Sequence, residues 1–222
     1  MSTPLRRPAA ALLALLCAAA LGAGAVLGLA GCSGGQDRPA APAQEAPAAP
    51  ETYVFTDDLG REVELPARID RICPSGFTAQ QVLLTMAPDK MVGLAQELND
   101  DQLKIFGEKF ADYPVFGAVL GAKDDLNREA VAAAAPQVII DTGEAKKGAK
   151  EDLDALQEQL GIPVIFIEAK LSDYGAAYER LGELLGMEER GGELSTYCTD
   201  VYNKTVTTME NIPENERVRM AY

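Results

Sequence analysis

The sequence predicts an α/β fold: a lobe built on a parallel β-sheet with helices on both faces, followed by one long helix. Two observations carry this prediction. Short apolar segments alternate with helical segments of about 10–15 residues, the pattern of a parallel sheet covered on both sides. From Glu193 to Asn211, apolar residues recur at steps of three and four, the spacing of one helix face.

A β-hairpin is the first folded element that the sequence predicts. Tyr53 and Phe55 alternate with other residues and are expected to face Val63 and Leu65 across a turn. Gly60 lies in that turn, where glycine adopts the positive φ that tight turns require.

Strand and helix segments then follow one another. Strands are predicted where short apolar runs are bounded by turn residues, at 69–73, 91–95, 137–141 and 163–168, with a brief extended piece at 115–117. Helices are predicted between them, at 78–86, 101–110, 127–135, 151–160 and 172–185. This alternation is Rossmann-like. Ligands of such sheets bind outside the carboxyl ends of the strands, which here are followed by loops at 74–78, 96–99, 113–121, 142–148 and 169–173.

The first 32 residues have the pattern of a secretion signal and are excluded from the fold. Arg6 and Arg7 precede an uncharged apolar run at 9–30. The run ends in Leu-Ala-Gly-Cys, which resembles the lipobox of bacterial lipoproteins, with Cys32 as the lipidated first residue. A plain transmembrane anchor is the alternative, because the run is long enough to span a bilayer. Residues 33–51 are rich in Ala and Pro and contain no larger aliphatic side chain, so we expect a disordered linker.

Composition limits the partners and the chemistry. The formal net charge is −14, which argues against nucleic acid and anionic membrane surfaces as partners. There is no His, so the usual general base and the commonest metal ligand are missing. Ser75 lacks the Gly-x-Ser-x-Gly elbow, and the segment 117–124 is one residue short of a phosphate-binding loop. We therefore expect a binding protein, with no enzyme activity, no intrinsic cofactor and no metal site.

The long helix is followed by residues 217–222, which alternate like the start of a strand. We therefore expect one lobe of a two-lobed protein, truncated after its N-terminal lobe, with the second lobe missing. The expected boundaries are a signal peptide at 1–32, a linker at 33–51, an α/β lobe at 52–190, an interlobe helix at 191–213 and the first strand of the other lobe at 214–222.

Two segments of the chain resemble a known family. Residues 56–66, TDDLGREVELP, and Asn127-Arg128-Glu129 leading into 135–140, APQVII, resemble solute-binding proteins of ATP-binding-cassette (ABC) importers. The resemblance covers about 52–222 and is to the class whose lobes are joined by one long helix. Gln137 stands where that family usually has Asp, at an expected surface position, so the difference weakens the resemblance little.

The resemblance implies a function. It implies an extracytoplasmic lipoprotein, at the cell surface or in the periplasm, that captures an iron–siderophore complex. The protein would deliver that iron chelate to a membrane permease driven by a separate ATPase subunit. Haem, cobalamin or an oxyanion are alternative cargoes. A membrane-anchored adhesion or binding lipoprotein without a transport role is the alternative from another class.

The resemblance also implies a role for Glu129, which would pair with arginines of the permease. A carboxylate in the first turn also complements the positive end of its own helix, so both roles stay open. The loop of Ser75, Gly76, Phe77 and Thr78 opens a helix whose free N–H groups suit a ligand oxygen. Alternatively, Ser75 or Thr78 caps that helix without any ligand.

Further candidates lie near the expected ligand loops. Tyr113, Phe116 and Glu144 are predicted ligand contacts, whereas Tyr174 fits core packing better. Glu144 and Asp141 suit a cation, but the neighbouring lysines 146 and 147 favour an ordinary solvated cluster. Cys73 and Cys198 are expected to be two separate thiols, with a disulfide as the alternative.

Overall fold

The computed structural model of the chain describes residues 51–118 and 126–218. The predicted signal peptide, the predicted lipidation site Cys32 and most of the predicted linker lie outside these residues. The strands are β1 (Thr52–Thr56), β2 (Glu62–Pro66), β3 (Ile72–Pro74), β4 (Val138–Gly143) and β5 (Val164–Glu168). The helices are α1 (Phe77–Met86), α2 (Asp100–Phe106), α3 (Arg128–Ala134), α4 (Ala149–Leu160), α5 (Tyr174–Leu185) and α6 (Glu188–Glu210). Short 3-10 helices are η1 (Pro88–Lys90), η2 (Glu108–Asp112), η3 (Leu171–Asp173) and η4 (Glu214–Glu216).

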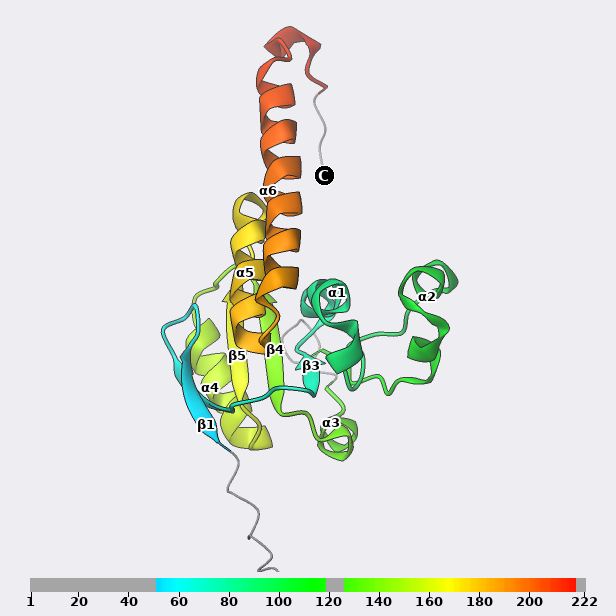
Figure 1. Ribbon diagram of the computed structural model, residues 1–222, viewed down its shortest axis with the longest axis vertical. Coiled ribbons are helices and arrows are strands. Elements are labelled where there is room, and N and C mark those ends of the chain that lie inside the picture. The colour runs from blue at the N-terminus through cyan, green and yellow to red at the C-terminus, as the bar shows by residue number, and fades with distance from the viewer. Residues whose placement is uncertain (1–50, 119–125, 219–222) are drawn as a thin grey trace, which may run out of the picture. The chain divides into compact units, whose positions relative to one another are not determined.

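The predicted α/β architecture is confirmed. Strands β3, β4 and β5 form a parallel sheet in that order, and β1 and β2 form a separate antiparallel hairpin (Figure 1). Side chains of the parallel strands alternate between two apolar clusters, as the pleat of a strand requires. One cluster joins the strands to α1, α5 and α6 and contains Ile72, Val138, Ile140, Ile165 and Ile167. The other joins them to α3 and α4 and contains Cys73, Ile139, Val164 and Phe166.

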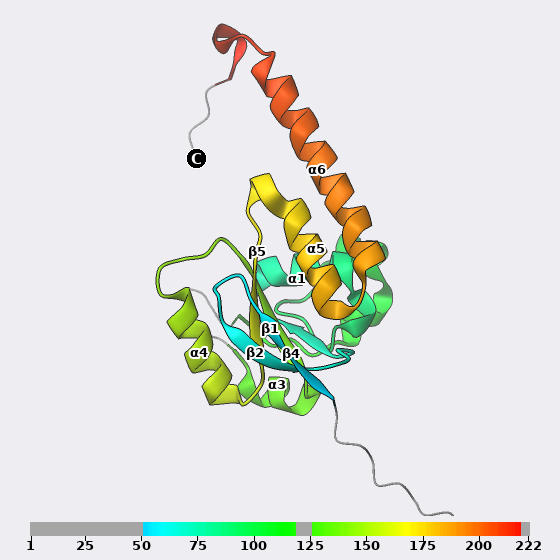
Figure 2. The ribbon, with the colours of Figure 1, turned by 60° about the vertical axis from the view of Figure 1, so that its left-hand side comes forward.

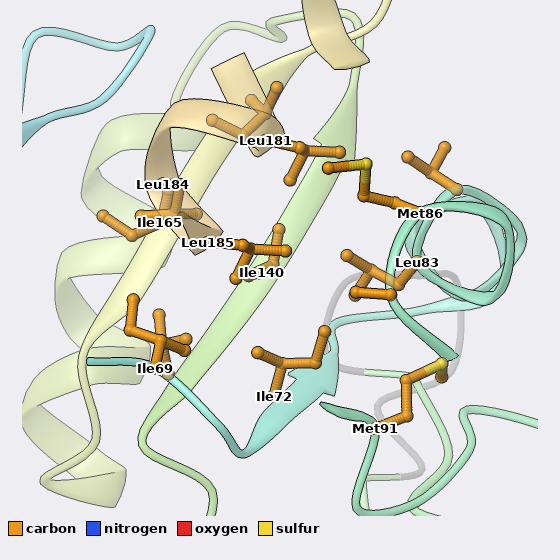
Figure 3. Packing of buried hydrophobic residues seen from close by; sticks show 14 of the residues in the cluster. Ile69, Ile72, Leu83, Met86, Met91, Ile140, Ile165, Leu181, Leu184 and Leu185 are labelled. Carbon is orange, nitrogen blue, oxygen red and sulfur yellow. The ribbon is translucent and has the colours of Figure 1, made fainter. Parts of the chain in front are cut away.

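Figure 3 shows the first of these clusters at close range. Ile140 and Ile165 of the sheet lie next to Leu181 and Leu185 of α5. Leu83 and Met86 of α1 lie at the opposite end of the same cluster. All of these side chains are at most 5% exposed. Burial of this apolar surface is what holds the helices on the sheet.

The strand predicted at 91–95 is replaced by two isolated bridges, Met91 to Ile72 and Leu94 to Val115. The fully buried side chain of Gln80 explains the difference. Its Oε1 accepts hydrogen bonds from the N–H groups of Ala95 at 2.6 Å and Gln96 at 3.0 Å, and its Nε2 donates to the Gln96 carbonyl at 3.1 Å. A buried side chain therefore satisfies backbone groups that a strand ladder would otherwise pair.

Two other predicted elements also differ in extent. The strand predicted at 69–73 is shorter and begins and ends later, at Ile72–Pro74. The helix predicted at 101–110 is split into α2 and η2, because Gly107 between them has φ +118°, which no helix adopts.

Gln137, expected at the surface, is partly buried and has a structural role. Its Oε1 accepts from the N–H groups of Asp70 at 2.7 Å and Arg71 at 3.0 Å, and its Nε2 donates to the Arg68 carbonyl at 3.0 Å. One partly buried side chain thus fixes the turn that leads into β3 against the start of β4.

The hairpin was predicted correctly and is attached to the outer edge of β5. Tyr53 pairs with Leu65 and Phe55 with Val63. In the turn, Asp57 Oδ2 accepts from the Phe166 N–H at 3.2 Å, and the Asp58 N–H donates to the Phe166 carbonyl at 3.2 Å. The hairpin turn therefore forms hydrogen bonds with backbone N–H and C=O groups on the edge of β5 that would otherwise be unpaired.

Arg61 completes this attachment and is 4% exposed. Its Nη1 donates to Asp57 Oδ2 at 3.1 Å and to the Val164 carbonyl at 3.0 Å, and its Nε donates to Asp154 Oδ1 on α4 at 2.7 Å. Because both Arg61 and Asp57 are buried, each depends on the other for its charge to be compensated.

α6 begins at Glu188, ahead of the Gly191-Gly192 pair at which the helix was expected to start. Gly191 is instead inside the helix, where α6 crosses α5. A Cβ atom at Gly191 would lie 2.6 Å from the Tyr178 carbonyl oxygen and 3.1 Å from Gly182 Cα. The glycine is thus required for close packing of two helices and does not mark a helix end.

Only the first part of α6 is buried in the lobe. Gly191, Leu194 and Ser195 are its buried residues, and beyond them the helix runs past the end of α5 (Figures 1 and 2). Tyr197 and Val201 on the predicted apolar face are 68% and 47% exposed. After η4, Arg217 and Val218 are not in a strand, and the rest of the predicted strand falls on residues 219–222, outside the described residues. Within the described part of the chain, no helix combines the length and apolarity needed to cross a membrane.

We predict that Arg61→Gln lowers the free energy of unfolding by about 3–5 kcal/mol, because it leaves the carboxylate of Asp57 buried without its counter-charge. Arg68→Gln is the matched control, since Arg68 is 84% exposed in its pair with Asp70 and such pairs contribute less than about 1 kcal/mol. Urea unfolding of both variants measures the difference. Equal losses in the two variants would contradict the role given to Arg61.

We also predict opposite effects for neighbouring glycines of α6. Gly191→Ala should destabilise the protein by about 1–3 kcal/mol, because its methyl group meets the backbone of α5. Gly192→Ala should stabilise it by about 0.5–1 kcal/mol, because a Cβ there has no atom within 4 Å and Ala favours helix. Thermal and urea unfolding check the signs, and two changes of the same sign would refute the proposed close approach.

Candidate ligand cleft

A cleft of about 790 Å³ lies at the carboxyl ends of the parallel strands. The end of β4, the amino-terminal turn of α1 and one face of α4 form its walls. Its lining residues are Ser75, Gly76, Phe77, Thr78, Ala79, Arg128, Asp141, Thr142, Gly143, Glu144, Lys146, Ala149, Asp152, Ala155, Leu156, Gln159, Phe166 and Ala169. This is the edge of the sheet at which the sequence predicted a ligand site.

Ser75 continues β3 by one residue and joins it to β4. Its N–H donates to the Ile140 carbonyl at 3.0 Å, and its hydroxyl donates to Oδ1 of Asp141. Neither Ser75 nor Thr78 caps α1, since the N-cap is Gly76 and no side chain bonds to the helix amides. The capping alternative for this loop is therefore wrong.

Asp141 has a carboxyl group whose pKa is raised above the ordinary value. The main cause is loss of solvent on burial, and the Ser75 hydroxyl, the Thr142 N–H and the positive charge of Lys146 oppose it. Burial thus favours the neutral form of a carboxyl group that lies in the wall of the cleft.

Thr142 follows Asp141 and is one of the lining residues that were not among the predicted ligand contacts. It is 6% exposed, and its hydroxyl Oγ1 has no hydrogen-bond partner among the described residues. The only signal in the sequence was its place in the loop after a predicted strand, because Thr is also an ordinary strand residue. A buried hydroxyl without a partner costs about 1–3 kcal/mol.

The cleft carries charges of both signs. Arg128 and Lys146 line it together with Asp141, Glu144 and Asp152. Glu144, Asp152 and Lys146 are exposed, whereas Asp141 is partly buried and bonded to Ser75. No group of three or more metal-ligating side chains occurs in the residues that the structure describes.

The structure brings together Ser75, Gly76, Phe77, Thr78 and Glu144 of the predicted ligand contacts. It places two of the three predicted aromatic contacts, Tyr113 and Phe116, elsewhere. Phe116 is fully buried in the second apolar cluster, so its ring presents no surface to a ligand. Tyr113 packs edge-on against Phe110, with ring centroids 4.8 Å apart, in the first cluster. Tyr174 also packs against that cluster, as expected.

Glu129 is exposed on the first turn of α3 and is not among the residues that line the cleft, although its neighbour Arg128 is. The helix is capped by Asn127, whose Oδ1 accepts from the Ala130 N–H at 3.0 Å. No ion pair of Glu129 is present within the described ranges.

Cys73 and Cys198 are both free thiols, which excludes the disulfide alternative. Cys73 is fully buried in the sheet, and burial raises its pKa to about 12. A thiol in that environment stays protonated at neutral pH and is not a nucleophile.

Comparison with solved structures shows which proteins share this fold. An ABC transporter solute-binding protein from Sulfurospirillum deleyianum superposes with a TM-score of 0.64 at 23% identity, over 74% of this chain and 51% of that one. The molybdate periplasmic binding protein MolA of a Haemophilus influenzae ABC transporter gives 0.58 at 19% identity, over 75% and 56%. The TroA-like periplasmic binding protein FepB from Veillonella parvula gives 0.54 at 24% identity, over 72% and 50%.

The chain has the fold of these ABC-transporter solute-binding proteins. It spans about half the length of the solved structures that it matches. No family model and no curated protein matches its sequence. At these levels of identity the superpositions show the fold alone, and what each of those proteins binds is not transferred to this chain.

We predict that Asp141→Asn changes how stability depends on pH. Because the folded pKa of Asp141 is raised, its contribution to stability is complete below the ordinary value of 3.8 and is lost as pH rises through the folded pKa. Asn retains an acceptor for the Ser75 hydroxyl without that loss. Relative to wild type, the variant should therefore gain stability as pH rises.

Denaturant unfolding at several pH values from about 3.8 upward measures this effect. Asp152→Asn is the control, because it removes the same charge from an exposed position of the same cleft. A variant whose stability relative to wild type falls as pH rises would show that burial does not raise this pKa.

Proposed function

We propose that the chain is part of an extracytoplasmic solute-binding lipoprotein of an ABC importer. In this role it captures an iron–siderophore-type complex in the cleft and delivers it to a membrane permease. The observation that carries the proposal is the cleft of about 790 Å³ at the carboxyl ends of β3, β4 and β5, on a lobe with the fold of ABC-transporter solute-binding proteins. Cys32 is the proposed site of lipid anchoring.

The shape and the lining of the cleft support capture of an amphipathic solute. Phe77 lies in the lining with its ring 49% exposed, and Leu171, in η3 just after the cleft residue Ala169, is 77% exposed. Polar groups of Ser75 and Glu144 and the charge of Lys146 line the same space. A few polar groups among apolar surface suit a small organic ligand.

The placement of Glu129 supports the proposed delivery step. Its carboxylate is exposed on a helix that Asn127 holds in place, outside the cleft lining. It therefore has a fixed position from which to pair with an arginine of the permease while the cleft holds a solute. The binding role and the docking role fall on different residues, which makes them separable by mutation.

We predict that Glu129→Gln slows uptake of the solute by about tenfold or more while its affinity stays unchanged. A hydrogen bond to a charged group contributes about 1.5–3 kcal/mol, and about 1.4 kcal/mol corresponds to a factor of ten. Uptake is measured in cells that carry the permease and its ATPase, and affinity by native mass spectrometry with ferric siderophores. Glu189→Gln, in the first turn of α6, is the matched control.

Equal loss of affinity and uptake in Glu129→Gln would assign this residue a structural role. Uptake that is the same in cells with and without the chain would refute the importer role itself. A chain that stays bound to cells and holds no solute would favour an anchored adhesion protein.

A further inference from the structure

We infer that Arg61 is a positioning residue of the cleft, because it holds α4, one wall of the cleft, against the hairpin and the edge of the sheet. Release of α4 from Arg61 is then a local opening of the lobe that changes the width of the cleft. This inference rests on the proposed function, since it takes the cleft to be the ligand site. It adds a residue outside the cleft lining that sets the affinity for the ligand.

The first observation is that few side chains of α4 are buried. Of its 12 residues only Leu153 and Leu156 are buried, whereas α5, which has the same length, buries seven. α4 is bounded by Gly148 and Gly161, both in the left-handed conformation, and no side chain caps its amino end. A helix with so little buried surface is expected to open before the rest of the lobe unfolds.

The second observation is a set of polar contacts on one side of α4. Arg61 donates from Nε to Asp154 Oδ1 at 2.7 Å and from Nη2 to Gln157 Oε1 at 3.4 Å. Gln157 Oε1 also accepts from the Val164 N–H of β5 at 2.9 Å. Arg61 is itself bonded to Asp57 and to the Val164 carbonyl, so these contacts join α4 to the hairpin, which lies beside it (Figures 1 and 2).

The third observation is that another side of α4 lines the cleft. Lining residues recur there at steps of three and four: Asp152, Ala155 and Gln159. Neither Asp154 nor Gln157 is a lining residue. Because one helix carries both the contact with Arg61 and a wall of the cleft, movement of α4 away from Arg61 changes the cleft without changing any side chain that lines it.

Hydrogen exchange of the isotope-labelled chain, followed by amide NMR, tests the local opening. An isolated helix of 12 residues is marginal in water, so α4 exchanges its amides once it leaves the hairpin. In the wild type, the amides of residues 153–160 should exchange at least a hundredfold faster than those of Ile140 and Ile165 in the sheet. Their exchange should also depend less on urea, because a local opening exposes less surface.

Variants of Asp154 test the contact with Arg61. Asp154→Ala should raise the exchange of α4 at least tenfold, because a hydrogen bond between charged groups is lost, although Ala favours helix more than Asp does. Asp154→Asn keeps an acceptor for Arg61 and should raise it less. Lys150→Ala is the matched control, since Lys150 Nζ bonds the other carboxylate oxygen of Asp154 at 2.9 Å within α4. This variant leaves the Arg61 contact in place and should change the exchange less than threefold.

Ligand affinity separates positioning from general stability. Asp154→Ala should weaken binding at least threefold in native mass spectrometry with ferric siderophores, although Asp154 does not line the cleft. Gly191→Ala acts where α5 and α6 cross. It should therefore speed exchange in the sheet and leave both the exchange of α4 and the affinity unchanged.

The inference is overturned if the amides of α4 exchange no faster than those of the sheet, or if Asp154→Ala and Lys150→Ala affect α4 equally. It is also overturned if Asp154→Ala opens α4 and affinity stays the same. Failure of the proposed function gives a different result. If the wild type neither binds nor supports uptake of a ferric siderophore, the transport role falls, while the exchange data alone decide whether Arg61 holds α4.

Discussion

The lobe depends on the buried ion pair between Asp57 and Arg61. β5 is the last strand of the parallel sheet, and its outer edge would present unpaired N–H and C=O groups. The hairpin turn satisfies these groups through Asp57 and the backbone of Asp58, and Arg61 bonds the Val164 carbonyl of the same strand. The charges of the pair are buried, so the arrangement is stable only while both partners are present.

The same hairpin connects the sheet edge to the long helix. Arg180 of α5 lies over the ring of Phe55, 4.5 Å from its centroid, and donates to the Thr56 carbonyl at 2.7 Å. α5 in turn contacts α6 closely at Gly182 and Gly191. The segment TDDLGR, which carried most of the resemblance to solute-binding proteins, is therefore a structural motif. Its residues line no part of the cleft, so this segment indicates the fold and gives no information on the cargo.

The sequence was sufficient to predict the elements that depend on local residue patterns. Apolar strand runs, the hairpin and the amphipathic helices follow from periodicity, and the ligand edge follows from parallel topology. The sequence was insufficient where a residue distant in the chain determines the local backbone structure. The side chain of Gln80 accepts the backbone hydrogen bonds of Ala95 and Gln96 where a strand was predicted at 91–95. The close approach of α5 explains the glycine at position 191. Phe116 lies in a loop by sequence, yet it packs against Gly93, whose missing side chain makes room for the ring. Thr142 could not be singled out, because only the folded cleft shows that its hydroxyl has no partner.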